Sequence, residues 1–378
     1  MQQKRPSVGL RHPAYVVDGM TTQSRHFELE TSLADRPERR DTRLRFEQWA
    51  RNPGCRANTL SAVHGIKMAE VAKADGVPPS MGQSPFAIAR GQTFERILFR
   101  NDGKTLHEAL VEAGVLPARS KGFADFRLRM NGGRLRDHDQ AIAGTSKLLA
   151  AIAAGKGKVA IIASATVRLP RLIMLPETIL VADVVAVTGD RKAPVLVVGE
   201  IKTYPDRGGH TDGGELAQAR AQAGVYVHGL RTALAELHLE SKIAVAAEGF
   251  LVLSRPGVNR PNVRAREDLS SQAWRAERGF KQLEEAAKGL PPPGSKDPVA
   301  AIRAAETDYR QECVSFCDRA PVCFAKAIRE SNPIVLGDDV ARFLGKVSLD
   351  RAAELINGAK PNDVAEFDLV RRIGVGAT

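Results

Sequence analysis

The sequence predicts an α/β protein, because short β-branched runs and alanine-rich runs alternate along the middle of the chain. Three runs are rich in Val, Ile and Ala and are bounded by Gly, Pro or charged residues, as is typical of buried strands: 158–167, 177–187 and 194–202. A helical run at 215–237 and a further apolar run at 242–254 follow them. The order strand, strand, helix, strand indicates a sheet packed against helices.

Local signals fix two features of this core. The runs 177–187 and 194–202 are separated by the six residues TGDRKA, whose turn-type chemistry predicts an antiparallel hairpin. Upstream, apolar residues recur at helical spacing over 84–98, and Ser84 and Pro85 are typical start signals. We therefore expect a helix at 84–98 before the strands begin.

Composition divides the chain into four expected regions. The breaker PPPG at 291–294 is the strongest boundary signal. The regions are a basic, helical N-terminal region that carries Cys55 (1–83), a core that contains the sheet (84–290), a cysteine region (291–332) and a helical C-terminal tail (333–378).

The charge balance favours a polyanionic partner. A formal net charge of +11 and an isoelectric point near 9.7 produce a positive field that attracts nucleic acid. The alternative is that the excess of arginine reflects composition alone. Arginines gather around Cys55 in a run that usually forms a solvated helix face: Arg36, Arg39, Arg40, Arg43, Arg45, Arg51 and Arg56.

Membrane and export signals are not expected. No stretch approaches about 18 uncharged apolar residues, and the first residues carry charges and proline where a signal peptide is apolar. We expect a cytoplasmic protein without a membrane partner. In a reducing compartment, the four cysteines favour metal ligation over two disulfides.

Two carboxylates and a lysine lie near the ends of the predicted hairpin strands. Glu200 and Lys202 project from the same face because strand side chains alternate, and the hairpin brings Asp183 close to Glu200. Such oxygen-rich sites suit Mg²⁺ or Mn²⁺, and a lysine beside them orients water or stabilises negative charge. Phosphodiester hydrolysis needs these functions. The alternative is a weak pair of exposed charges.

The following helix carries a polar row in an otherwise alanine-rich segment. Gln222 and Tyr226 are four residues apart and share one helix face with Gln218. An amide and a phenol on one face can bind a DNA phosphate or base. The alternative is that Tyr226 packs the helix against the core with its hydroxyl at the surface.

In this order the residues resemble the PD-(D/E)xK superfamily in its RecB-like branch. Asp183, Glu200-x-Lys202 and Gln222-x-x-x-Tyr226 match its catalytic and helical motifs, and Gly91-x-x-x-Glu95 resembles its upstream helix. The match spans about Gly91 to Tyr226. Many members carry a histidine in the upstream helix, whereas this chain has Gln-Thr-Phe before Glu95.

The resemblance implies a restriction-endonuclease-like mixed sheet flanked by helices. It implies Asp183, Glu200, Lys202 and Glu95 as the catalytic residues. The implied metal ligands are Asp183, Glu200, Glu95 and the backbone carbonyl of Ile201, and the implied DNA-binding residues are Gln218, Gln222 and Tyr226.

Three of the four cysteines are clustered. Cys313, Cys317 and Cys323 follow one another within eleven residues, and Cys55 lies far upstream. Four thiolates suit Zn²⁺ or an iron-sulfur cluster, and the alternative is buried, inert cysteines. One cysteine before the motifs and three after them resembles the iron-sulfur members of the RecB-like branch, such as the nuclease of CRISPR adaptation and the AddB nuclease domain.

That resemblance implies a structural 4Fe-4S cluster that joins the helical N- and C-terminal additions. Its usual spacing begins x2, whereas this chain has x3, so Zn²⁺ stays open. A metal clip that closes a long loop restricts the unfolded chain and couples folding to metal binding.

We expect a Mg²⁺- or Mn²⁺-dependent deoxyribonuclease that acts on single-stranded DNA or duplex ends, more as an exonuclease than as an endonuclease. The alternatives are a DNA-binding or scaffold subunit that does not cut, in a repair or antiviral defence complex, and an iron-sulfur redox or sensor protein. No GxxxxGK[ST] motif occurs, so any helicase motor or integrase is a separate partner.

Overall fold

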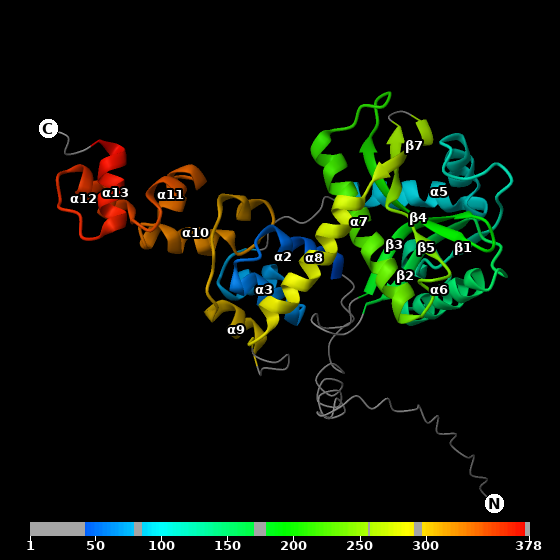
Figure 1. Ribbon diagram of the computed structural model, residues 1–378, viewed down its shortest axis with the longest axis horizontal. Coiled ribbons are helices and arrows are strands. Elements are labelled where there is room, and N and C mark those ends of the chain that lie inside the picture. Colours follow the sequence, from blue (N-terminus) through cyan, green and yellow to red (C-terminus); the bar gives the residue numbers. More distant parts are fainter. Residues whose placement is uncertain (1–41, 79–84, 170–178, 256–257, 291–296, 375–378) are drawn as a thin grey trace, which may run out of the picture. The chain divides into compact units, whose positions relative to one another are not determined.

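The computed structural model describes residues 42–78, 85–169, 179–255, 258–290 and 297–374, all within the compact unit Glu38–Thr378 (Figure 1). The strands are β1 (Phe123–Asp125), β2 (Ile161–Arg168), β3 (Ile179–Gly189), β4 (Pro194–Pro205), β5 (Ala244–Val245), β6 (Glu248–Arg255) and β7 (Val258–Asp268). The α-helices are α2 (Thr42–Arg51), α3 (Arg56–His64), α4 (Met68–Ala74), α5 (Pro85–Glu112), α6 (His138–Ala153), α7 (Gly213–Glu236), α8 (Ser270–Ala287), α9 (Pro298–Ala304), α10 (Ala320–Arg329), α11 (Asp338–Leu344), α12 (Leu349–Ile356) and α13 (Val364–Ile373).

The sheet is mixed, in the order β1-β2-β3-β4-β6-β7, with β5 also paired to β4. Strand β3 is antiparallel to both of its neighbours, β2 and β4, whereas β4 and β6 are parallel. The parallel pair requires a crossover, and α7 supplies it between β4 and β6. The predicted hairpin of β3 and β4 is therefore confirmed.

Helices pack on both faces of the sheet, as the apolar runs predict. On one face, Leu149 of α6 and Leu230 of α7 belong to the same buried cluster as Ile162 and Val198. On the other face, Leu106 and other apolar residues of α5 pack against strand residues. Figure 1 shows α7 lying alongside the strands. The α/β class and the mixed sheet flanked by helices are confirmed.

One predicted strand differs from the structure, and the predicted upstream helix agrees with it. The run 242–254 was expected to be one strand, but it forms two strands, β5 and β6. The chain bends between them, because β5 pairs with the start of β4 and β6 pairs with its later part, from Gly199 onward. The helix expected at 84–98 is confirmed: it begins at Pro85 and runs to Phe99, after which Arg100–Gly103 leave helical geometry and a second helical stretch continues to Glu112. Ser84 and the PPPG boundary at 291–294 lie outside the described residues.

The arginine-rich run is only partly a solvated face where the structure describes it, because Arg51 and Arg56 are exposed whereas Arg43 and Arg45 are not. The side chain of Arg45 is buried and donates to the carbonyl of Ala62 at 2.9 Å, which ties α2 to α3. Arg43 is partly buried. Arg36, Arg39 and Arg40 lie outside the described residues. The interpretation as a solvated face was wrong for Arg43 and Arg45, because α2 packs on the core through Phe46 and Trp49.

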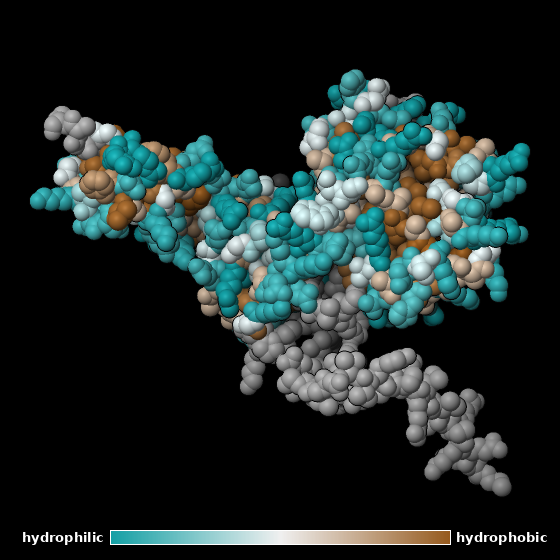
Figure 2. Space-filling model, in the orientation of Figure 1, coloured by the Kyte–Doolittle hydropathy of each residue, from teal (hydrophilic) through white to brown (hydrophobic). Residues whose placement is uncertain are grey.

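Beyond the core, short helices form two smaller apolar clusters. Residues of α3, α4 and α9 pack around Leu60, Val71 and Ile302. The helical tail expected at about 338–372 is observed as α11, α12 and α13, with a cluster of its own around Leu355 and Leu369. Among the described residues, no helix is long and apolar enough to cross a membrane. The surface seen in Figure 2 is largely hydrophilic.

Candidate functional site

The candidate site lies where β3 and β4 separate. The two strands pair from Gly189 and Pro194 as far as Val184 and Gly199, and their pairing stops there, while β4 continues beside β6 through Lys202. Asp183 is the first residue of β3 beyond this pairing. Its Oδ2 accepts a hydrogen bond from the backbone N–H of Ile201 at 3.0 Å. The carboxylate thus lies at the point where β3 and β4 separate, which we call the fork. There it accepts a hydrogen bond from a backbone N–H that the pairing of β3 with β4 leaves without a partner.

Strand β3 changes its packing faces at the same point. Leu180 and Ala182 belong to the core cluster under α7, whereas Val184 and Ala186 belong to the cluster under α5. A regular strand would keep all four on one face. Ser164, opposite Asp183 on β2, has a φ of 52°, which is rare for a non-glycine residue in a strand. This irregularity places Asp183 between the two faces.

Glu200 and Lys202 share one face of β4, as strand alternation predicts. The Lys202 ammonium lies 2.5 Å from Glu200 Oε1. The Glu200 side chain is 0% exposed, and its Oε2 has no hydrogen-bond partner among the described residues. Lys202 is 20% exposed, so its ammonium lies between the buried carboxylate and solvent.

Burial and like charge shift the acids of the site in the same direction. Burial, and then the nearby Asp183 carboxylate, raise the pKa of Glu200 to about 8, although Lys202 and Arg43 oppose the shift. Burial and Asp183 likewise raise the pKa of Glu95 to about 7, against Arg127 and Lys202. The pKa values of neighbouring carboxylates rise in this way when the positive charge around them is too small to offset their burial and mutual repulsion.

The electrostatic interactions of Glu95 with Asp183 and Lys202 place Glu95 at the same site. It lies on α5, one residue after Phe94, which is buried under the sheet. Arg127 donates to both oxygens of Asp125, at 2.9 and 2.7 Å, and its guanidinium lies over Phe99 of α5. Glu95, Asp183 and Lys202 therefore approach one another from α5, β3 and β4.

Arg43 is a site residue that the sequence argument missed. On α2 it pairs with Glu47 at 2.9 Å. Burial lowers the pKa of Arg43, but Tyr226, Glu47, Glu200 and Asp183 together raise it above its usual value. A guanidinium from the N-terminal helices thus faces the carboxylates. Its only sequence signal was its place in the arginine-rich run.

The polar row on α7 divides between core and surface. Tyr226 is buried in the core cluster, and burial, Glu200 and Asp183 raise its pKa well above its usual value, so its hydroxyl lies toward the carboxylates. Gln222 is also buried, and its Oε1 has no hydrogen-bond partner among the described residues. Gln218 is exposed and accepts a hydrogen bond from the Tyr204 hydroxyl at 3.2 Å.

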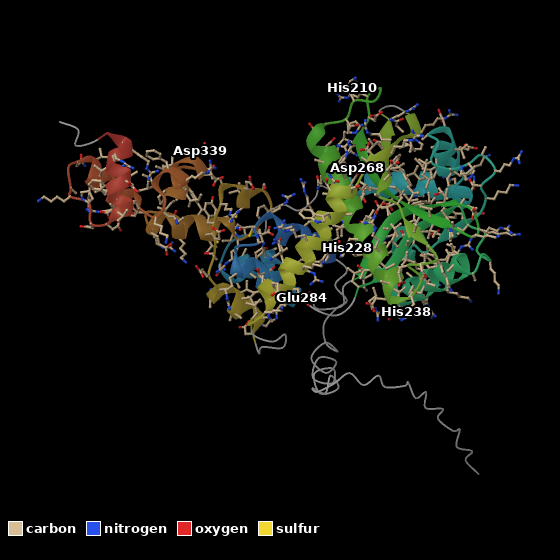
Figure 3. All side chains as sticks on the ribbon, viewed as in Figure 1. His210, His228, His238, Asp268, Glu284 and Asp339 are labelled. Atoms are coloured by element: carbon tan, nitrogen blue, oxygen red, sulfur yellow. The ribbon has the colours of Figure 1, made fainter. Side chains whose placement is uncertain are left out.

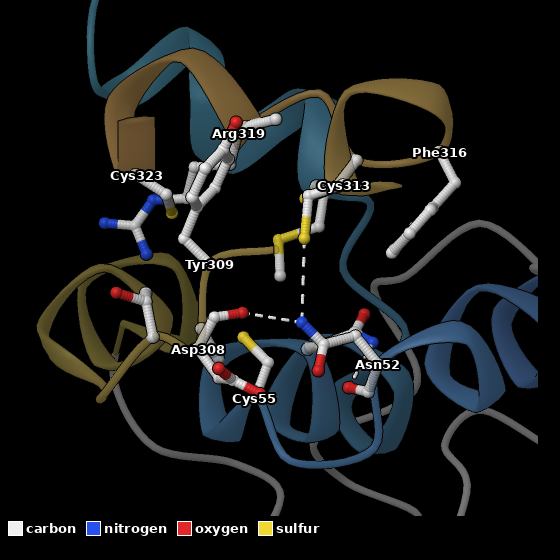
Figure 4. Close-up of a pocket in the computed structure, with 14 residues that line it drawn as sticks. Asn52, Cys55, Asp308, Tyr309, Cys313, Phe316, Arg319 and Cys323 are labelled. Carbon is white, nitrogen blue, oxygen red and sulfur yellow. Dashed lines mark hydrogen bonds between the residues drawn. The ribbon is translucent and has the colours of Figure 1, made fainter. Parts of the chain in front are cut away.

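All four cysteines line one small cavity, of about 20 Å³ (Figure 4). Cys55 precedes α3, whereas Cys313, Cys317 and Cys323 lie between α9 and the first turns of α10. Asn52 was not singled out from the sequence. Its amide donates to Cys313 Sγ at 3.6 Å and to the carbonyl of Asp308 at 2.6 Å.

Burial raises the pKa of two of the thiols in this cavity, those of Cys317 and Cys323. Burial raises the pKa of Cys317 to about 12, opposed by a backbone hydrogen bond from Arg319 and reinforced by the other three cysteines. Within the described residues, no three His, Cys, Asp or Glu side chains are arranged closely enough to hold one metal ion. The expected four-cysteine cluster is therefore not shown, although the four residues share a cavity.

Comparisons with protein-family models, with curated proteins and with solved structures found no match to this chain.

Proposed function

We propose that this chain is a Mg²⁺- or Mn²⁺-dependent deoxyribonuclease with a restriction-endonuclease-like core, and that it acts as an exonuclease on single-stranded DNA or duplex ends. The observation that carries the proposal is the fork of β3 and β4. There, Asp183 lies beside a fully buried Glu200, and Lys202 and Glu95 face the same point. Burying several carboxylates together is costly unless a cation compensates them.

The donors present fit a small divalent cation. Asp183 and Glu200 supply hard oxygen ligands, and Glu200 Oε2 is buried without a hydrogen-bond partner among the described residues. The backbone carbonyl of Ile201, between Glu200 and Lys202, is the third ligand that we propose, and Glu95 is the fourth. Mg²⁺ usually takes few protein ligands and keeps several waters. Among the described residues no three acidic side chains lie close enough to hold one ion, so the proposal requires Asp183, Glu200 and Glu95 to move closer together when the cation binds.

A bound divalent cation would polarise the scissile phosphoryl group and lower the pKa of a water molecule. The ammonium of Lys202 is partly exposed and held by Glu200, so it can orient the attacking water or stabilise negative charge on the phosphate oxygens. Arg43 adds a second cation. As the water oxygen bonds to phosphorus and the bond from phosphorus to the leaving oxygen breaks, a carboxylate oxygen of Glu95 that does not bind the cation can accept the proton of the water, and the leaving oxygen takes a proton from solvent.

The test uses substitutions in the proposed site and matched controls outside it. Glu200→Gln and Lys202→Ala should abolish Mg²⁺- or Mn²⁺-dependent cleavage of an end-labelled DNA strand and leave its binding largely intact. Glu240 and Lys242 have the same acid-x-Lys spacing and are exposed, so Glu240→Gln and Lys242→Ala should cleave normally. Unchanged cleavage by the site variants would overturn the assignment. DNA binding without cleavage by the unaltered protein would favour the non-cutting scaffold.

We further propose that the four cysteines hold a structural 4Fe-4S cluster, with Zn²⁺ as the alternative. The support is that Cys55 and the three C-terminal cysteines line one cavity, where Cys313 Sγ already accepts from Asn52 and from the N–H of Arg310. Hydrogen bonds to ligating sulfurs are typical of such clusters. The structural role follows because the cluster would join segments far apart in the sequence.

Anaerobic purification followed by a visible spectrum and by iron and zinc analysis decides which metal is bound. Because thiolates are the ligands and burial keeps Cys317 protonated, metal loading should release protons. Cys55→Ala should lose the metal and lower the melting temperature. A stable variant that retains its cluster would contradict the structural role. A protein without iron or zinc would contradict ligation altogether.

A further inference from the structure

A groove lies between α2, α7 and α8, next to the candidate site. It encloses about 620 Å³, within the range of ligand sites. Glu47, the partner of Arg43, and Gln218, which lies four residues before Gln222 on α7, both line it. Stacked rings hold the three helices that form the groove together: His228 of α7, labelled in Figure 3, stacks on Phe280 of α8, and Phe280 stacks on Phe46 of α2.

An exposed tryptophan lies on the α8 side of this groove. Trp274 is 56% exposed, although an indole usually gains from burial. The Arg278 guanidinium lies 5.3 Å from the centre of its ring and holds it from one side. Small residues such as Ala217 and Ala221 line the groove on α7 and leave room beside the ring.

The charge of the groove suits a polyanion. Arg51, Arg275 and Arg278 line it and are exposed. Glu47 is the one acidic side chain among the described residues that line it, and Arg43 already neutralises it. An apolar peptide would leave these arginines without partners, whereas phosphates would pair with them.

We propose that this groove binds single-stranded nucleic acid, with one base stacked on Trp274 and with phosphates held by Arg275 and Arg278. Only an unpaired base offers its face to an aromatic ring, so the groove would select single strands over duplexes. The inference rests on the proposed nuclease function in one respect: the groove would deliver the strand to the carboxylates.

The experiment measures binding by the full-length protein without divalent cations, so that nothing is cleaved. The probe is a fluorescein-labelled oligothymidylate of about 16 nucleotides, the upper end of known single-strand site sizes. Trp274→Ala should weaken binding about 5- to 150-fold, the effect of losing one base-aromatic stack. Trp274→Phe should retain most of the affinity. Binding of a blunt duplex should change little in either variant.

A second readout is the protein's own fluorescence. The chain has two tryptophans, and both line the groove, but Trp49 is 1% exposed, so an unlabelled oligothymidylate should quench mainly the emission of Trp274. The Trp274→Phe variant, in which Trp49 is the remaining tryptophan, should lose most of the quenching. Phe367→Ala removes an exposed aromatic residue on α13, outside the groove, and should bind like the unaltered protein.

The outcomes separate this inference from the proposed function. The groove assignment would be overturned if the Trp274 variants bound and were quenched by single strands as the unaltered protein is. If the unaltered protein also cleaved DNA, the proposed nuclease function would still hold. Weakened binding and lost quenching in a protein that cleaves nothing would support the groove and count against the nuclease. Equal losses for single strands and duplexes would overturn the stacking role.

Discussion

Replacing Glu200 by glutamine should change how stability depends on pH. Burial and Asp183 raise the pKa of Glu200 from an ordinary 4.5 to about 8. The folded protein therefore holds this proton more tightly than the unfolded chain does. The free energy of unfolding contributed by the group is fully present below pH 4.5 and is lost as the pH rises through about 8.

The size of this loss follows from the shift. Each pKa unit corresponds to about 1.4 kcal/mol, so the shift sets a ceiling of about 5 kcal/mol, and local relaxation lowers the expected loss to about 2–5 kcal/mol. Glutamine carries no charge to bury, so Glu200→Gln should lack this part of the decline. The Glu200→Gln substitution also removes the ion-pair partner of Lys202, which shifts the free energy of unfolding of the variant at every pH. This shift does not change the slope, because Lys202, whose pKa is raised above 10.5, does not titrate in this window.

The assay is urea unfolding of the metal-free protein at pH values from about 5 to about 9, the window set by the linkage. Glu95, whose pKa is also raised, contributes equally to both proteins and cancels in the comparison. The exposed Glu240→Gln control should follow the unaltered protein. Excess Mg²⁺ should flatten the decline in the unaltered protein only, because a cation binds the ionised carboxylate. Parallel curves for Glu200→Gln and the unaltered protein would refute the reasoning.

Three further substitutions test other parts of the structure. Arg43→Ala should slow single-turnover cleavage about 100-fold, with partial recovery in Arg43→Lys, and an unchanged rate would remove Arg43 from the site. Asp75→Asn breaks a buried pair in which Arg319 Nε lies 2.7 Å from the carboxylate, so the free energy of unfolding in urea should fall by about 3–5 kcal/mol. A Cβ on Gly199 would lie 2.2 Å from the Phe250 ring, so Gly199→Ala should cost about 1–3 kcal/mol, and a stability equal to the unaltered protein would contradict this packing.

Much of the core could be predicted because its signals are local. Turn chemistry between two β-branched runs predicts the hairpin of β3 and β4, and the hairpin brings Asp183 and Glu200 together. The helical period predicts α7 to within two residues. The split of 242–254 into β5 and β6 could not be predicted in this way, because it depends on which part of β4 each strand meets.

The site was only partly predictable for the same reason. The pairing of Glu200 with Lys202 follows from strand alternation, but the complete burial of Glu200 could not be predicted, because burial depends on the packing of the whole fold. Arg43 reaches the carboxylates because α2 packs beside them through Phe46 and Trp49, and no spacing in the sequence encodes that contact. Gln222 and Tyr226 share a helix face as predicted, yet the structure turns that face into the core.

The sequence by itself determined the α/β class, the hairpin and the acid-acid-lysine set, because these depend on neighbours within one element or one turn. Tertiary structure alone decided that β3 and β4 separate at Asp183, that α5 brings Glu95 and α2 brings Arg43 to that fork, and that Cys55 meets the three C-terminal cysteines in one cavity. Contacts of this kind depend on the packing of distant surfaces, and burial there sets the charge that each carboxylate carries.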